Sequence, residues 1–531
     1  MLQAGLAWRS TPGAGVRQRG QAMVLFVVSL LVLGIGLIML FNTGQAVTKK
    51  VELVNAADAA AYSAAVQQAR AYNLVAYMNR AEVANEVAVA QIVTLYSMTN
   101  YVLSATKNLK EAARDLSYAL YVAAIFTEGA TLPVANAFQR ASQMLGKAQT
   151  AITNARNGMQ SPFAMAIRLL SEELNGAYSF ASNTIVKLTS ADSALLAKEI
   201  VDKNTSGKAK IGAGGLALLV IQYGEAQAYT KHYSLRKTPN GDTYGADRYA
   251  NVVMEARDGF SRQRNGEVLF GVIKKRGGTD VVTSSRGRRY YDSWVGADTL
   301  NFYLNLPWPF HDIDLPLAWG GAAGTNQTQG GFSRVAMQGY GNGKGWTSPY
   351  TVENGLHIDR YAGAVDNHSA GRKVRNDPAV GETGKGWLRG YAGLQDYDDI
   401  KDDKATVPYL NGKSAAQNGV KALDVGPVFT VAVEQDMDTV RTSSNINGIG
   451  GPPDFDVPDK AISDKMTALS SAQVYFDRPR GLFDNILDSR REMGSLFSPY
   501  WQARLVDTPC RERQLIAVSY GSVAPCMPVG G

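Results

Sequence analysis

The first strong pattern in the chain is an apolar segment close to its start. No charged residue occurs between Arg19 and Lys49, and residues 23–41 are apolar except for Ser29. A helix of about 20 apolar residues crosses the hydrocarbon core of a bilayer, because it pairs its own backbone polar groups there. The pattern therefore predicts one transmembrane helix over residues 22–41. The predicted membrane anchor includes Met23, Leu33 and Phe41.

The charges on either side of this segment indicate its orientation. Three arginines precede it and two lysines follow it, so the positive-inside tendency favours a cytoplasmic N-terminus over residues 1–21. These basic residues are Arg9, Arg17, Arg19, Lys49 and Lys50. The alternative is a cleaved signal peptide, for which residues 44–46 offer a small-x-small site. The apolar core is longer than in such signals, which favours a retained anchor.

A long helical region follows the anchor. Residues 45–128 contain neither glycine nor proline and are rich in residues that favour helices. If unbroken, this helix extends over about 125 Å, as a straight stalk or as a hairpin with a bend. Two more helices are expected at residues 134–157 and 163–203, with Pro162 between them. We therefore predict a helical stalk or bundle over residues 42–206.

The pattern within this region also bears on its packing. Residues 55–61 are almost all small, which lets neighbouring helices approach closely. Polar residues interrupt the apolar series, and this favours a multi-helix bundle over a two-stranded coiled coil. The interrupting residues are Asp58, Gln68 and Asn79. Residues 116–126 and 216–221 are apolar but too short to span a membrane, and we expect them in the protein core.

Residues 207–531 show mixed patterns that predict an extracytoplasmic α+β region. Helices are expected at residues 226–236 and 249–257, and the glycine-rich residues 319–346 predict loops between short strands. Alternating or β-branched runs predict strands. These strands are expected at residues 428–434, 473–476, 501–506 and 515–519. The predicted fold class is thus a single N-terminal transmembrane helix, then a long α-helical stalk or bundle, then an α+β region.

Composition and charge narrow the classes of partner. The chain of 531 residues is 45% hydrophobic and 19% charged, which is typical of a folded protein. Its net charge of +7 is small for this length, and no nucleic-acid partner is predicted. The basic residues cluster at residues 274–276 and at Arg286, Arg288 and Arg289. We expect a solvated surface there, with contact to an anionic partner as the alternative.

The search for catalytic and metal-binding patterns finds none with the required spacing. Residues 412–414 are Gly-Lys-Ser, but Val407 stands where a phosphate-binding loop needs glycine. His311 and His368 have aspartates nearby but no helical metal-binding motif. The acidic run at residues 396–403 lacks the glycine of a calcium loop, so a solvated turn is expected, with weak cation binding as the alternative. The sequence predicts no catalytic residue, no cofactor and no metal site.

The two cysteines, Cys510 and Cys526, are predicted to form a disulfide if the C-terminal tail is in an oxidising compartment. Such a bond stabilises the tail by about 3 kcal/mol. A strand expected at residues 515–519 lies between the cysteines and lets the segment leave and return to one sheet edge. Two free buried thiols are the alternative.

The start of the chain resembles a known bacterial family. Residues 19–26 (RGQAMVLF), the apolar span and residues 55–61 (NAADAAA) together resemble the N-terminal module of TadE/TadG-like proteins of tight-adherence (Flp) pilus assembly. The resemblance covers about residues 17–70, and residues 495–504 resemble the ends of longer members less specifically. It implies a non-enzymatic pilus-assembly protein of the bacterial inner membrane with its bulk in the periplasm. The implied partners are membrane lipid and pilin-like or pilus-assembly proteins, with an oligomer through the helical region as a further expectation.

Two departures from the family pattern limit what the resemblance implies. Processed members carry Glu five residues after the cleavage-site glycine, whereas Leu25 stands at that distance from Gly20. Removal of the anchor by a prepilin peptidase is therefore not implied. Residues 115–119 lack the last serine of an Asp-x-Ser-x-Ser metal motif, so the adhesion site of some relatives is not carried over. The alternatives are a secreted or surface adhesin with a cleaved signal, and a periplasmic enzyme or metal-binding protein.

Overall fold

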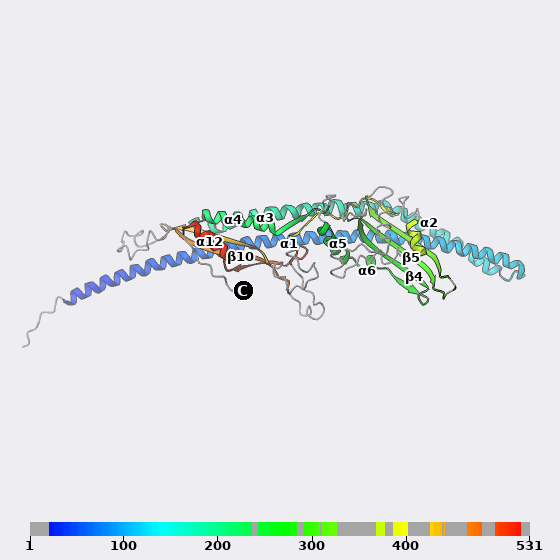
Figure 1. Ribbon diagram of the computed structural model, residues 1–531, viewed down its shortest axis with the longest axis horizontal. Coiled ribbons are helices and arrows are strands. Elements are labelled where there is room, and N and C mark those ends of the chain that lie inside the picture. The colour runs from blue at the N-terminus through cyan, green and yellow to red at the C-terminus, as the bar shows by residue number, and fades with distance from the viewer. Residues whose placement is uncertain are drawn as a thin grey trace, which may run out of the picture.

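The protein is built along one very long helix. The computed structural model describes residues 21–235, 243–283, 291–307, 309, 311–326, 368–376, 386–401, 425–437, 440, 465–479 and 494–521. Helix α1 (Gln21–Phe126) comprises 106 residues and is therefore about 160 Å long. Figure 1 shows it running through the whole elongated molecule. No glycine or proline lies between residues 45 and 128, and the helix accordingly continues without a break from the apolar segment into the body.

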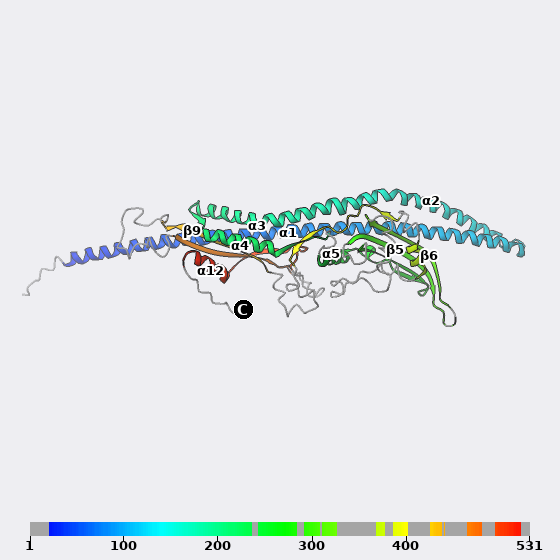
Figure 2. The same cartoon turned by 45° about the horizontal axis from the view of Figure 1, so that its top comes forward.

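Of the two alternatives left open for this helix, α1 runs unbroken to Phe126, and the chain then reverses in a tight turn directly after it. Residues 127–131 form the turn, in which Glu128 and Gly129 have positive φ. The chain then runs back along α1 through further helices, as Figures 1 and 2 both show. These are α2 (Leu132–Arg168), the π-helix η1 (Leu169–Leu174) and α3 (Asn175–Thr205). The expected separation of two helices at Pro162 is wrong, because α2 continues through this residue and the irregular turn falls in η1.

A four-stranded antiparallel sheet packs across the first buried part of α1. Its strand order is β1-β9-β10-β11, and Ala432 pairs with Leu469 in the central pair. The strands are β1 (Ala209–Ile211), β9 (Val425–Asp436), β10 (Lys465–Phe476) and β11 (Trp501–Val506). Helix α4 (Ala213–Tyr229) packs against β9 of this sheet, and helix α12 (Cys510–Ser519) packs against α4. Three predicted strands are confirmed, whereas the strand predicted at residues 515–519 is wrong because these residues belong to α12.

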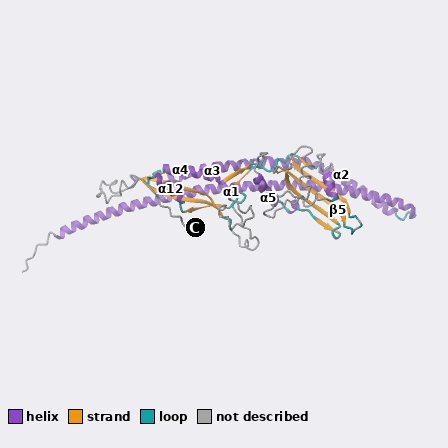
Figure 3. Ribbon diagram, viewed as in Figure 1, coloured by secondary structure: helices purple, strands orange, loops and turns teal. Residues whose placement is uncertain are grey.

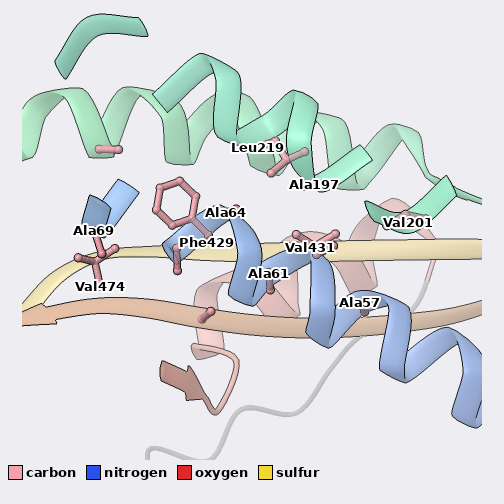
Figure 4. Packing of buried hydrophobic residues seen from close by; sticks show 14 of the residues in the cluster. Ala57, Ala61, Ala64, Ala69, Ala197, Val201, Leu219, Phe429, Val431 and Val474 are labelled. Atoms are coloured by element: carbon pink, nitrogen blue, oxygen red, sulfur yellow. The ribbon is translucent and has the colours of Figure 1, made fainter. Parts of the chain in front are cut away.

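The small residues on α1 make this first core possible. Ala57, Ala61 and Ala64 are buried against α3 and the sheet, as Figure 4 shows. Facing them are Val201 of α3 and Val431 of β9. Methyl side chains leave room for the helix backbone to approach both layers, which confirms the close packing expected of residues 55–61.

A second sheet packs on α1 nearer to the hairpin turn. Its order is β3-β4-β5-β6-β7, antiparallel except for the β6–β7 pair. The strands are β3 (Gly266–Val268), β4 (Ile273–Thr283), β5 (Tyr291–Leu304), β6 (Ile313–Thr325) and β7 (Trp387–Leu388). Helix α8 (Ser369–Asn376) contacts β5 and β6. Residues 319–325 were predicted as loops but lie in the long strand β6.

Short elements connect the two sheets. Strands β2 (Thr230–Tyr233) and β8 (Tyr397–Ile400) pair with each other, and helices α5 (Thr243–Ala256) and α6 (Gly259–Arg262) lie beside the second sheet. Figure 3 shows α5 between the two larger sheets. The helix predicted at residues 226–236 is partly wrong, because α4 ends at Tyr229 and β2 follows. Strand β8 also contradicts the solvated turn expected at residues 396–403.

Candidate functional site

The apolar start of α1 is uncovered by the rest of the protein. The exposed fractions of Met23, Leu33 and Phe41 are 72%, 64% and 43%. Among the helices in the described residues, α1 is the one that is both long enough and apolar enough to cross a membrane, judged by length and composition. Figure 1 shows this blue segment projecting beyond the sheets. Among the described residues, the body therefore does not cover the large side chains that form the predicted anchor.

Farther along α1, two buried glutamates lie at the centre of the molecule. Glu86 accepts hydrogen bonds from Trp294 Nε1 at 2.8 Å, from Tyr391 Oη at 2.8 Å and from Asn175 Nδ2 at 3.0 Å. Burial raises the pKa of Glu86 to about 7, although these hydrogen bonds oppose the shift. The carboxyl group thus joins β5, α3 and the segment after β7 to one point on α1.

Glu82 lies one turn earlier and is equally buried. It accepts a hydrogen bond from Tyr249 Oη at 3.1 Å, while its Oε1 atom has no hydrogen-bond partner among the residues that the structure describes. Burial raises the pKa of Glu82 well above its ordinary value, and the charge of Glu86 adds to the shift. The protonated form is therefore favoured, which removes most of the penalty of enclosing a charge.

Asn79 extends this polar line toward β8 and the C-terminal segment. Its Nδ2 atom donates to the carbonyl oxygens of Asp398 at 2.9 Å and Leu496 at 2.7 Å. Asp399 is buried and forms an ion pair with Arg248 at 2.7 Å. Burial raises the pKa of Asp399 even though Arg248 opposes the shift. These contacts fasten segments from distant parts of the sequence to α1.

His232 is held by the acidic run that was expected in solvent. Its ring nitrogens lie 3.7 Å from Asp396 and 3.3 Å from Asp398. The hydrogen bonds to Asp396 and Asp398 raise the pKa of His232 to about 9, against partial burial. A protonated His232 therefore pairs β2 with β8 by charge as well as by backbone hydrogen bonds.

A second buried network attaches the β4–β5 sheet to α1. Arg264 Nε lies 2.8 Å from Asp298 Oδ1, and Ser97 on α1 donates to Asp298 Oδ2 at 2.7 Å. Lys275, expected on a solvated surface, is only partly exposed and reaches Asp298 at 3.4 Å. Burial lowers the pKa of this lysine. The other predicted basic cluster, around Arg288, lies outside the described residues.

Polar residues on α1 donate or accept hydrogen bonds that hold distant segments of the chain together. The aspartates near His311 form hydrogen bonds within the protein. Asp312 accepts a hydrogen bond from Tyr303 Oη, and Asp314 accepts one from Ser369 Oγ. In the part of the chain that the structure describes, no group of three or more His, Cys, Asp or Glu side chains is arranged to hold a metal ion. Asp366, beside His368, lies outside those residues.

A shallow hollow of about 920 Å³ opens beside the first sheet. It brings Asp58 of α1 together with Arg504 and Thr508 from the C-terminal segment. Arg513 also lines it and donates through Nε to the carbonyl oxygen of Thr508 at 2.7 Å. The hollow therefore carries both charges and lies against the small-residue stretch of α1.

The predicted disulfide is not tested by these contacts. Cys510 is the first residue of α12, and Cys526 lies outside the described residues. The segment between the cysteines begins with a helix where a strand was expected, so the sheet-edge argument for the bond is wrong. The bond itself stays a prediction.

Comparison with known proteins bears on the first part of α1. Residues 20–68 match the family model described as putative Flp pilus-assembly TadE/G-like. The N-terminal module is TadE/G-like. The match supports involvement in Flp/Tad pilus assembly. A search of curated proteins and a search of solved structures found no match to the chain.

The TadE/G-like module corresponds to two structural parts of α1. It comprises the uncovered apolar segment and the alanine-rich stretch that packs on the first sheet, including Asp58 at the hollow. The sequence predicted both parts. It missed Glu82 and Glu86, although their spacing from Asn79 places all three polar residues on one face of α1. The sequence signal for this site was the repetition of polar residues on one face of a helix that is otherwise apolar on that face.

Proposed function

We propose that this protein is a membrane-anchored, non-enzymatic component of Flp/Tad-type pilus assembly in a bacterial inner membrane. Residues 22–41 span the bilayer, residues 1–21 are cytoplasmic, and the helical region 42–206 and the α+β region 207–531 are periplasmic. The observation that carries the proposal is the coincidence of the TadE/G-like match with an apolar helix segment that the body leaves uncovered.

The mechanism is mechanical positioning. Helix α1 contains the anchor and also contributes Ala57, Tyr72 and Val93 to the cores below both sheets. Because the helix is unbroken, the membrane and the body share one rigid element, with no hinge between them. The body is thereby held at a fixed orientation to the membrane, where pilin-like subunits are delivered.

The hollow beside Asp58 supplies a surface for such a partner. It belongs to the same module that matches the family, and its mixed charges suit a polar protein surface. Asp58→Arg should weaken capture of the system's pilin-like proteins in cross-linked membranes about 10-fold, because it places a third positive charge beside Arg504 and Arg513. Glu173→Arg, at an exposed position on η1, is the matched control and should leave capture unchanged. If the Asp58→Arg and Glu173→Arg variants capture equal amounts of pilin-like protein, the hollow is not the binding surface.

Anchoring is tested in a deletion strain complemented with full-length variants. Leu33→Arg places a charge at the centre of the span, which costs about 2.5–3.5 kcal/mol on insertion scales. It should move the protein from the carbonate-resistant membrane fraction and abolish surface pili. Leu188→Arg introduces the same charge at an exposed position of α3 and should do neither. A deletion strain that still makes normal pili contradicts the proposed function.

A further inference from the structure

The far end of the helical hairpin is packed in an unusual way. Between α1 and α2 the buried positions carry small side chains, whereas the large apolar side chains point outward (Figures 1 and 2 show this end of the molecule). The buried residues are Ala113, Ser117, Ala124, Ala135 and Ser142. The exposed residues are Leu116, Tyr118, Val122, Ile125, Phe126, Leu132 and Val134. Residues 116–126, predicted to lie in the core, are thus largely at the surface.

This arrangement is the reverse of a hairpin that folds in water. There, large apolar residues face the partner helix and polar residues face solvent. Small residues between helices and large apolar residues outside are typical of helices that pack in lipid. Ile125 and Phe126 have exposed fractions of 77% and 82%, so the tip carries a substantial apolar surface that the protein itself does not cover.

The backbone of the turn also suits an apolar medium, because several of its polar groups are paired internally. Gly129 N donates to the carbonyl oxygen of Ala124 at 2.9 Å, and Leu132 N donates to that of Gly129 at 3.1 Å. The hydroxyl of Thr131 donates to the carbonyl oxygen of Leu120 at 2.9 Å. Unpaired backbone groups exclude irregular turns from hydrocarbon, and this turn avoids much of that penalty.

Charge and length fit a single lipid leaflet. Glu128 is the one charged residue in residues 116–139. The eleven residues from Leu116 to Phe126 rise about 16 Å, close to half of the roughly 30 Å hydrocarbon core. Below them, residues 107–115 and 139–147 together hold five basic and two acidic residues, a net charge of +3. A basic collar beneath a tip whose one charged side chain is Glu128 is complementary to anionic headgroups above an acyl layer.

We infer that the hairpin tip, residues 116–138, inserts into one leaflet of a second lipid surface, facing the membrane that holds the anchor. The 85 residues from Phe41 to Phe126 separate the two apolar ends of α1 by about 130 Å, so both cannot enter the same bilayer while α1 stays straight. The protein then bridges two lipid surfaces. The identity of the anchoring membrane rests on the proposed function, but insertion of the tip is tested separately.

The test uses full-length protein whose anchor is embedded in nanodiscs. These are mixed with vesicles of phosphatidylethanolamine and phosphatidylglycerol, and co-flotation measures capture of the nanodiscs. The tip variant is Ile125→Ser/Phe126→Ser. The matched control is Phe180→Ser/Leu188→Ser, which removes two exposed apolar side chains from the middle of the hairpin. Circular dichroism checks that both variants keep their helix content, as expected for changes at exposed sites.

Wild-type and control nanodiscs should float with the vesicles, and the tip variant should bind at least about 10-fold more weakly. A Phe126→Trp variant should show a blue-shifted emission on vesicle addition and quenching by lipids brominated on the acyl chain. Equal flotation of the tip variant and wild type overturns the inference. So does pairing of nanodiscs without vesicles that the tip variant abolishes, because the tip then binds a second copy of the chain. Neither result affects the carbonate-extraction test of the anchor.

Discussion

At Gly320 on β6, the second sheet lies directly against the backbone of α1. A Cβ atom at this residue would lie 2.1 Å from Tyr101 N and 2.6 Å from the carbonyl oxygen of Ser97. Both atoms belong to helix backbone, so rotation of a side chain cannot relieve the clash. Gly320→Ala should therefore force the sheet and the helix apart.

The size of the effect follows from the contacts beside this glycine. Restoring an ordinary contact of about 3.4 Å to Tyr101 N requires a local separation of about 1.3 Å. Asn100 Nδ2 donates to the carbonyl oxygen of Gly321 at 2.8 Å, and Trp319 N donates to Ser104 Oγ at 2.8 Å. Stretched by that amount, neither remains a hydrogen bond. Each buried group left unpaired costs about 1–3 kcal/mol, so a loss of about 3 kcal/mol or more is expected.

Thermal unfolding followed by circular dichroism in detergent measures this loss. The midpoint for Gly320→Ala should fall by about 5 °C or more. Gly158→Ala in α2 is the matched control, because nothing lies within 4 Å of its Cβ position. It should be neutral or stabilise the protein by about 0.5–1 kcal/mol. A midpoint for Gly320→Ala within 1 °C of wild type would refute the close approach of β6 to α1.

Three further outcomes are expected. The raised pKa of Glu86 means that the folded state keeps a proton between about pH 4.5 and 7 that the unfolded chain has lost, so stability falls as pH rises through that window, by about 3 kcal/mol in all. Glu86→Gln should remove that part of the slope in detergent-solubilised denaturation, whereas exposed Glu173→Gln should not. A periplasm-active reporter fused after Gly531 should be active, and activity only in an N-terminal fusion would reverse the topology. Thiol labelling of unreduced, denatured protein from the native host should label neither Cys510 nor Cys526; two labels per chain would remove the disulfide.

Local signals in the sequence were sufficient where an element is decided by its own residues. The absence of glycine and proline over residues 45–128 predicted the continuity of α1, and β-branched and aromatic runs predicted β9 and β11. By contrast, residues 515–519 form a short aliphatic run, which suits a strand and a helix equally well. Its neighbours decide the outcome, since Ile516 packs against Leu218 of α4 and Ala432 of β9.

The errors in the candidate site come from partners that are distant in sequence. The acidic pattern around Asp399 predicts exposure to solvent, yet the ion pair with Arg248, about 150 residues earlier, makes the burial of Asp399 tolerable. The glycines of residues 319–324 predict loops, because nothing in the local sequence shows that a helix backbone lies against Gly320. The exposure of residues 116–126 was missed for a related reason, since apolar character does not reveal which medium surrounds a helix tip.

The unbroken course of α1 has a consequence for how the module and the body act together. Each residue of an α-helix turns the chain by about 100°, so the face that Asp58 presents is fixed relative to the face of the anchor at Phe41. Because the helix is unbroken, the directions of Glu82 and Glu86 around its axis are fixed relative to Phe41 as well. In the proposed arrangement, any rotation or tilt of the apolar segment in a bilayer is therefore imposed on both sheets and on the hairpin tip. A chain with a flexible linker after the span would lose this coupling, and the polar and alanine contacts on α1 would then hold the body together without orienting it.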